Sequence, residues 1–110
     1  MTPTGSPAAA VANDDAHIVV AFDDNRLIPD LFGEFDRNLA LLEQRLGVDT
    51  VARGNQVTIR GSTDACTRAR LALDMLYGRL QEGHELVAGD VEGAIRMAEA
   101  AEAQLSLPTL

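Results

Sequence analysis

The sequence predicts an α+β fold in which helices cover one face of a three-stranded antiparallel sheet. Three short runs rich in β-branched residues, at 17–22, 48–53 and 56–60, are bounded by Gly, Asp or Asn, as strands usually are. Leucine and alanine recur at helical spacing in the segments between and after these runs. The order is strand, helix, helix, strand, strand, helix and one further helix, which lets the strands pair antiparallel beneath the helices.

The amino-terminal part of the chain is divided by its composition. Residues 1–15 are rich in Ala, Pro, Thr and Asp, which predicts a disordered leader. The strand at 17–22 then ends at the polar triplet 23–25. Asn25 is expected to cap a short helix, with Pro29 in its first turn, where the missing N–H matters least.

A second helix is predicted to follow an interruption at Gly33. Asp36 is expected to cap this helix, because its carboxylate can accept hydrogen bonds from the first-turn amides. Leu39, Leu42 and Leu46 give the helix an apolar stripe. The glycine that follows, at position 47, is expected to end it, because glycine adopts a positive φ without strain.

The second half of the chain predicts a hairpin and two helices. Gly54-Asn55 forms the tight turn between the second and third strands, and residues 61–64 cap a long helix that ends near Gly83. We expect one domain over residues 16–84, followed by an additional helix at 85–104.

The charge balance restricts the class of partner. Seventeen acidic residues against nine basic ones give a net charge of −8, and every basic residue is an arginine. Tight, non-specific binding to a phosphate backbone relies on many cationic contacts, so this balance disfavours it. It favours a protein partner or a locally basic patch.

The chain is expected to be cytoplasmic. Its one cysteine, Cys66, cannot form an internal disulfide, which favours a reducing compartment. Residues 1–11 lack the charged start and continuous apolar block of a signal peptide. No apolar run approaches the ~18 residues that a membrane span requires, so we predict no membrane partner.

Three segments carry a resemblance to a known family. The stretch 31–39, LFGEFDRNL, resembles the part of KH domains that holds the GXXG loop, and the hairpin at 51–61 resembles the strand pair that follows it. More specifically, DDNRL at 23–27, LFGEFDRNLALLEQRLGV at 31–48 and ARGNQVTIRG at 52–61 are similar, in that order, to the amino-terminal region of PhoH-like proteins.

The resemblance implies a KH-like domain with the order β-α-α-β-β-α at the front of a longer protein. PhoH-like proteins are P-loop ATPases named for phosphate starvation induction, and they are linked to RNA metabolism and to an rRNA-maturation endoribonuclease. ATP and Mg²⁺ would be bound by a downstream domain, joined through a linker at residues 105–110. A Walker A loop requires a lysine, and this chain has none, so we expect the chain itself to be non-catalytic and to hold no cofactor.

The GXXG-like loop departs from the KH pattern in its charge. Asp36 stands where the second glycine would be and Glu34 lies inside the loop, so two carboxylates face the place of a phosphate. We expect this loop to bind nucleic acid weakly or not at all, because a carboxylate and a phosphate ~4 Å apart repel by ~1 kcal/mol even in water. Phe35 between them would stack a base or anchor a partner if exposed, or pack into the core if buried.

The candidate contacts for RNA or a partner come from this loop and from the hairpin: Gly33, Glu34, Phe35, Asp36, Arg37, Arg53 and Arg60. The last two flank the hairpin turn, and a basic patch built from them with Arg37 and Arg45 would grip phosphates. The alternative is that these arginines are solvated and pair with nearby acids, namely Glu34, Asp36, Glu43 and Asp49.

Two functions of different classes fit these observations. The chain can be an accessory module through which a PhoH-like ATPase engages RNA or a protein of RNA metabolism. Alternatively, it can be a self-association or regulatory domain without nucleic-acid binding, which would make it a homo-oligomer. In that case Ala94, Ala98 and Ala101 would allow close approach of the last helix. The sequence contains no cluster of cysteine and histidine, so we predict no metal site.

Overall fold

The order of elements agrees with the α+β order that the sequence predicts. The computed structural model describes residues 15–106, with side chains as far as residue 101. Its elements are β1 (Ala16–Ala21), the 3₁₀ turn η1 (Asn25–Leu27), α2 (Ile28–Phe32), the 3₁₀ turn η2 (Glu34–Asp36), α3 (Arg37–Leu46), β2 (Asp49–Arg53), β3 (Gln56–Gly61), α4 (Thr63–Gln81) and α5 (Ala88–Ser106). The KH-like order β-α-α-β-β-α with one extra helix is therefore confirmed.

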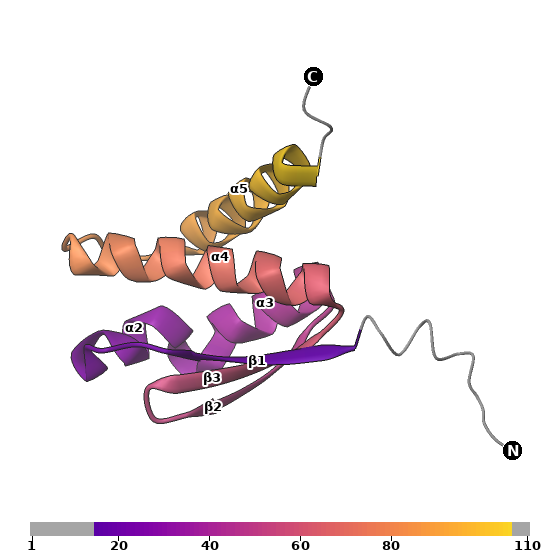
Figure 1. Ribbon diagram of the computed structural model, residues 1–110. Helices are drawn as coiled ribbons and strands as arrows, with labels where there is room; N and C mark the ends of the chain where they lie inside the picture. Colours follow the sequence, from indigo (N-terminus) through magenta and orange to yellow (C-terminus); the bar gives the residue numbers. More distant parts are fainter. Residues whose placement is uncertain (1–14, 107–110) are drawn as a thin grey trace, which may run out of the picture.

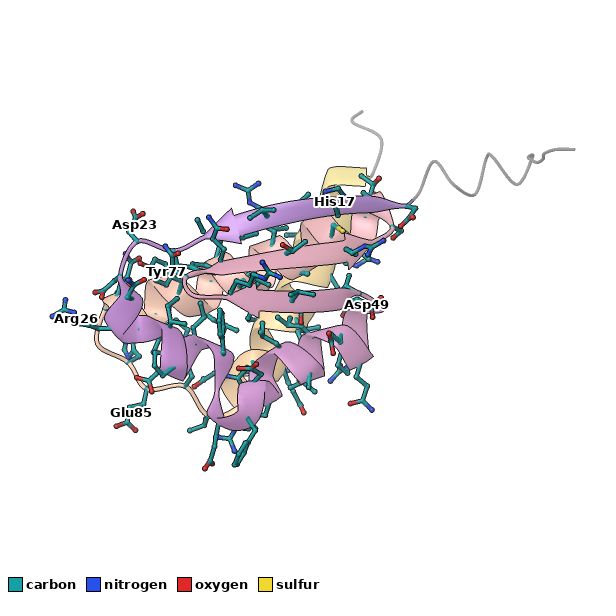
Figure 2. The ribbon with its side chains drawn as sticks, turned by 90° about the horizontal axis from the view of Figure 1, so that it is seen from below. His17, Asp23, Arg26, Asp49, Tyr77 and Glu85 are labelled. Atoms are coloured by element: carbon teal, nitrogen blue, oxygen red, sulfur yellow. The ribbon has the colours of Figure 1, made fainter. Side chains whose placement is uncertain are left out.

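The three strands form one antiparallel sheet in the order β1-β3-β2. Val57 of β3 pairs with Val20 on one side and with Ala52 on the other. Side chains alternate between the two faces of a strand, so these three residues share the face that the helices cover. Figure 1 shows α4 lying across the sheet, and Figure 2 shows the opposite face of the sheet free of helices.

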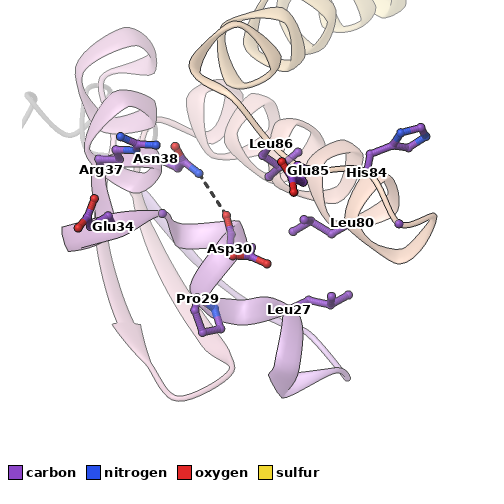
Figure 3. Close-up of a pocket in the computed structure, with 12 residues that line it drawn as sticks. Leu27, Pro29, Asp30, Glu34, Arg37, Asn38, Leu80, His84, Glu85 and Leu86 are labelled. Atoms are coloured by element: carbon purple, nitrogen blue, oxygen red, sulfur yellow. Dashed lines mark hydrogen bonds between the residues drawn. The ribbon is translucent and has the colours of Figure 1, made fainter.

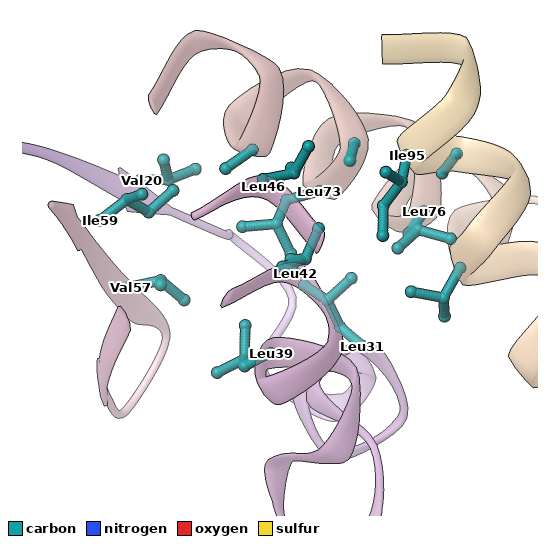
Figure 4. Packing of buried hydrophobic residues seen from close by; sticks show 14 of the residues in the cluster. Val20, Leu31, Leu39, Leu42, Leu46, Val57, Ile59, Leu73, Leu76 and Ile95 are labelled. Atoms are coloured by element: carbon teal, nitrogen blue, oxygen red, sulfur yellow. The ribbon is translucent and has the colours of Figure 1, made fainter. Parts of the chain in front are cut away.

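One hydrophobic core fills the space between the sheet and the helices (Figure 4). Leucines from three different helices are fully buried in it, and they meet the strand residues Val57 and Ile59; the leucines are Leu31, Leu42, Leu73 and Leu76. The helical stripes predicted from leucine and alanine spacing are therefore the surfaces that pack together.

The extra helix α5 belongs to the same core. Val91, Ile95 and Ala98 are fully buried, and α5 packs mainly against α4. It spans Ala88–Ser106, so it begins and ends later than the predicted range 85–104. The predicted linker at 105–110 is wrong at its first two positions, which are helical. Its last four positions and residues 1–14 of the predicted leader lie outside the described residues.

The helix caps agree with the predictions in part. Gly47 ends α3 with φ 72°, and the Ser62 side chain accepts from the Ala65 N–H at 3.1 Å at the start of α4. The cap of the first turn is Asp24 and not Asn25, because the Asp24 carboxylate accepts from the Arg26 N–H at 2.9 Å. Between residues 15 and 106, no helix has the length and apolar character that crossing a membrane requires.

Candidate functional site

The predicted GXXG-like loop is a real break between α2 and α3. Gly33 ends α2, donates its N–H to the Pro29 carbonyl at 2.9 Å and has φ 81° and ψ 167°, a combination that is almost exclusive to glycine. A Cβ atom at Gly33 would lie only 2.9 Å from Cγ of Asn38. Both the backbone angles and this close approach therefore require glycine. We call residues 33–37 the Gly33 turn.

Asn38 fixes this turn from the inside. It is 8% exposed and is the buried polar side chain of the described core. Its Nδ2 donates to the Leu31 carbonyl at 3.0 Å and to the Asp30 carbonyl at 3.4 Å (Figure 3), which satisfies acceptors at the end of α2. Sequence reasoning missed this role. The available signal was an asparagine next to the apolar stripe of α3, five positions after the glycine.

The outer side of the turn is strained and exposed. Phe35 and Asp36 have φ of 55° and 56°, the left-handed conformation that non-glycine residues rarely adopt. The Phe35 side chain is 95% exposed, so it is not packed in the core. Asp36 takes the N-cap position of α3, but the predicted cap bond is wrong: its backbone is left-handed, with φ 56° and ψ 29°, and its side chain forms no cap hydrogen bond.

A shallow groove of about 240 Å³ runs from Phe35 between α3 and β2. Glu43 of α3 lies in it and accepts from both the N–H and the hydroxyl of Thr50, at 2.7 and 3.0 Å. The ionised groups that line the groove are Asp36 and Glu43, both carboxylates. The groove therefore repels a phosphate. The Thr50 N–H at the edge of β2 is already hydrogen-bonded to Glu43, so it is not available to a ligand.

On the other side of the turn lies a larger hollow of about 500 Å³ (Figure 3). Its walls come from η1, α2 and the Gly33 turn on one side, and from the segment joining α4 to α5 on the other. Three carboxylates, one arginine and one histidine line it: Asp30, Glu34, Glu85, Arg37 and His84. With this mixture the hollow is not a basic pocket.

The predicted basic patch is not formed. Arg37 lies at the hollow, whereas Arg53 and Arg60 stand on β2 and β3, on the face of the sheet opposite to the core. Arg53 is beside the hairpin turn and Arg60 is opposite Asp49, at the other end of the ladder. Five of the seven candidates therefore lie together in the Gly33 turn. The other two, Arg53 and Arg60, lie at separate positions on β2 and β3.

The predicted ion pairs of these arginines are also not formed. In the described part of the chain, Arg37, Arg53 and Arg60 form no ion pair with the nearby acids that were expected to hold them. All three arginines are exposed. These three side chains therefore stand in solvent without an ion-pair partner among the described residues.

Comparisons with known proteins support the fold alone. No protein-family model matches the chain, and no curated protein matches it. A crystal structure of a protein of unknown function from Aeropyrum pernix is similar, with a TM-score of 0.61 and 20% sequence identity over 84% of this chain. The matched region covers 49% of that protein, so the chain spans about half the length of its structural neighbour.

Proposed function

We propose that this chain is a non-catalytic, cytoplasmic binding module, the accessory amino-terminal domain of a PhoH-like ATPase, which engages a protein partner through the Gly33 turn. The observation that carries the proposal is Phe35, whose ring is 95% exposed at the tip of a turn with two left-handed residues. Strained backbone persists only where the surrounding structure imposes it, and it gathers at binding sites.

The resemblance to PhoH-like proteins supports this proposal because its three segments fall on parts that build or adjoin the turn. DDNRL at 23–27 contains η1, whose last residue, Leu27, lines the hollow beside the turn. The segment 31–48 contains the turn and all of α3, and the segment 52–61 supplies the hairpin beside the groove. In this proposal, ATP and Mg²⁺ belong to a domain outside this sequence.

A protein partner fits the turn better than RNA does. The exposed ring is flanked by Glu34 and Asp36, and the groove that leads away from it contains Glu43. Carboxylates on both sides of the ring repel a polyanion but attract a basic protein segment. An exposed aromatic side chain is a typical anchor at protein interfaces, and here the residues on either side of it in the chain, Glu34 and Asp36, are both acidic.

Self-association through the last helix has no comparable support. Ala94 and Ala98 are buried against the rest of the same chain, so they do not form an available surface for close helix approach. We therefore retain the accessory module as the proposed function, with a protein of RNA metabolism as its partner.

The test compares two probes and two variants. The probes are the rRNA-maturation endoribonuclease of the source organism and a single-stranded RNA at low salt, both measured against the immobilised chain. The variants are Phe35→Ala and the matched control Val51→Ala, which shortens a side chain that is 51% exposed on the sheet. We expect Phe35→Ala to weaken endoribonuclease binding at least about tenfold, as loss of an aromatic anchor does, and Val51→Ala to leave it unchanged.

Other results would overturn the proposal. RNA binding that depends on Phe35 would make the turn a nucleic-acid site, and equal binding by wild type and Phe35→Ala would remove the anchor from the interface. Unfolding curves provide the control for structure, because truncation of so exposed a ring should change the free energy of unfolding by less than about 0.5 kcal/mol.

A further inference from the structure

The outer edge of β1 has unpaired backbone groups. The Phe22 N–H donates to the Asn55 carbonyl at 3.0 Å, and the Asn55 side-chain amide donates to the Phe22 carbonyl at 2.7 Å. Phe22 therefore faces β3. Successive residues of a strand direct their backbone N–H and C=O groups to opposite sides, so the backbone groups of Ala16, Ile18 and Val20 also face β3 and those of the three residues between and after them point outward. These outward residues are His17, Val19 and Ala21.

Nothing in the described part of the chain covers these groups. β1 contacts only β3 and α4 among the described elements. In Figure 2 β1 lies at the border of the sheet, with β3 on its inner side. An uncovered edge of this kind is a template for pairing with a further strand.

The side chains at the edge indicate what kind of strand fits. Val19 is 55% exposed at the middle of β1, beside Thr58 and then Val51 across the open face of the sheet. An added strand with an apolar residue at its centre would extend this row by one place. The edge is thus apolar in the middle and carries no ionised carboxylate between residues 16 and 22.

The two ends of the edge carry the charge. Asp15 precedes β1 and Asp23 follows Phe22, and both are exposed. If two copies paired antiparallel with Val19 opposite Val19, each Asp15 would meet an Asp23 of the other copy, and both chains carry a net charge of −8. Like charges opposite one another oppose this pairing, whereas basic residues at both ends of an incoming strand would be attracted.

We propose that the outer edge of β1 is a docking site for an extended segment of a partner protein that has apolar residues at its centre and basic residues at both ends. The segment would pair with the backbone of His17, Val19 and Ala21 and place its basic ends beside Asp15 and Asp23. This surface is separate from the Gly33 turn, since α3 lies beside β2 at the other edge of the sheet. Either site can therefore fail without the other.

The test is amide hydrogen exchange of the ¹⁵N-labelled chain with the synthetic peptide Lys-Thr-Val-Thr-Val-Thr-Val-Thr-Lys, blocked at both termini, whose central valine would lie opposite Val19 and whose lysines would lie opposite Asp15 and Asp23. We expect the peptide to slow exchange at His17, Val19 and Ala21 and to leave the already paired Ile18 and Val20 unchanged. The matched peptide with Glu in place of both Lys residues should give no protection. Replacing Asp15 and Asp23 together by Asn should weaken binding of the lysine peptide about two- to tenfold.

A pair of charge variants locates the site. Val19→Lys places a positive charge on the proposed edge and should weaken binding of the lysine peptide, whereas Val51→Lys alters the same row of the open face at the far strand and should not. Equal protection by the lysine and glutamate peptides, or no protection at millimolar peptide, would overturn the proposal. Protection that rises with protein concentration alone would identify a second copy as the occupant and overturn the choice of partner.

Discussion

The two edges of the sheet differ in whether other described parts of the chain cover them. At β2, α3 lies alongside the strand and the Glu43 carboxylate accepts from the N–H and the hydroxyl of Thr50. At β1, no described element lies beyond the strand, and Val19 is more than half exposed. One edge is therefore closed by a side chain of the fold, and the other is open to an incoming strand.

The connections between elements explain this difference. β2 follows α3 after Gly47 and Val48 alone, so the helix must return beside the strand that it precedes. The direction of α3 is set in turn by the Gly33 turn, where Gly33 and Asn38 hold the end of α2. Coverage of the β2 edge thus depends on a turn that is more than ten residues earlier in the chain. β1, in contrast, is followed by Phe22 and the polar triplet 23–25, and no described element covers its outer edge.

Among variants that test this difference between the two edges, Gly33→Ala should change the free energy of unfolding most. The alanine Cβ would approach Asn38 to 2.9 Å, and φ 81° with ψ 167° is a region that residues other than glycine avoid. We expect a loss of about 3 kcal/mol in the free energy of unfolding, measured by urea denaturation. Gly54→Ala is the matched control, since Gly54 has φ 57° but nothing within 4 Å of an added Cβ. Equal losses in the two variants would show that contact with Asn38 contributes nothing.

Asn38→Ala should have the next largest effect. It leaves the carbonyls of Leu31 and Asp30 without the amide that satisfies them and opens a space beside Gly33. Loss of a buried hydrogen-bond partner predicts a destabilisation of about 2 kcal/mol, read from the same denaturation curves. The exposed Asn25→Ala should change stability by less than about 0.5 kcal/mol. If the two asparagine variants were equally stable, the Asn38 bonds would not be what holds the turn.

Glu43→Ala tests the closed edge directly and should cost about 1 kcal/mol, because the carboxylate and Thr50 are only partly buried. The more specific readout is hydrogen exchange: the Thr50 amide should exchange faster, as an uncovered edge amide does, while the amides that face β3 keep their protection. Gln44→Ala, an exposed neighbour on the same helix, is the control. An unchanged Thr50 amide in Glu43→Ala would mean that α3 covers the β2 edge without this side chain.

Sequence reasoning predicted the features of this fold that depend on local chemistry. The glycine interruption at Gly33, the turn at Gly54 and the cap at Gly47 follow from backbone preferences that a single residue reveals. It did not predict the bond between Glu43 and Thr50, because that contact depends on how α3 meets β2 in space. It also predicted that Arg53 and Arg60 lie close together, which is wrong. Both residues flank the hairpin turn in sequence, but Arg60 lies at the far end of the β2–β3 pair, opposite Asp49.

The smallest effect should come from Asp36→Gly, and it should be a gain in stability. Asp36 has φ 56° and its side chain forms no cap bond, so glycine relieves backbone strain without removing a contact. The greater freedom of glycine in the unfolded chain offsets part of this relief, which leaves a net stabilisation of about 0.5 kcal/mol. The same change within a helix, Asp74→Gly in α4, should instead destabilise by about 0.5 kcal/mol, because glycine is a poorer helix former than aspartate and the exposed pair with Arg70 is lost. A loss of stability in Asp36→Gly would show that the carboxylate supports the turn, and the strain at its tip would then belong to the fold and not to the binding of a partner by Phe35.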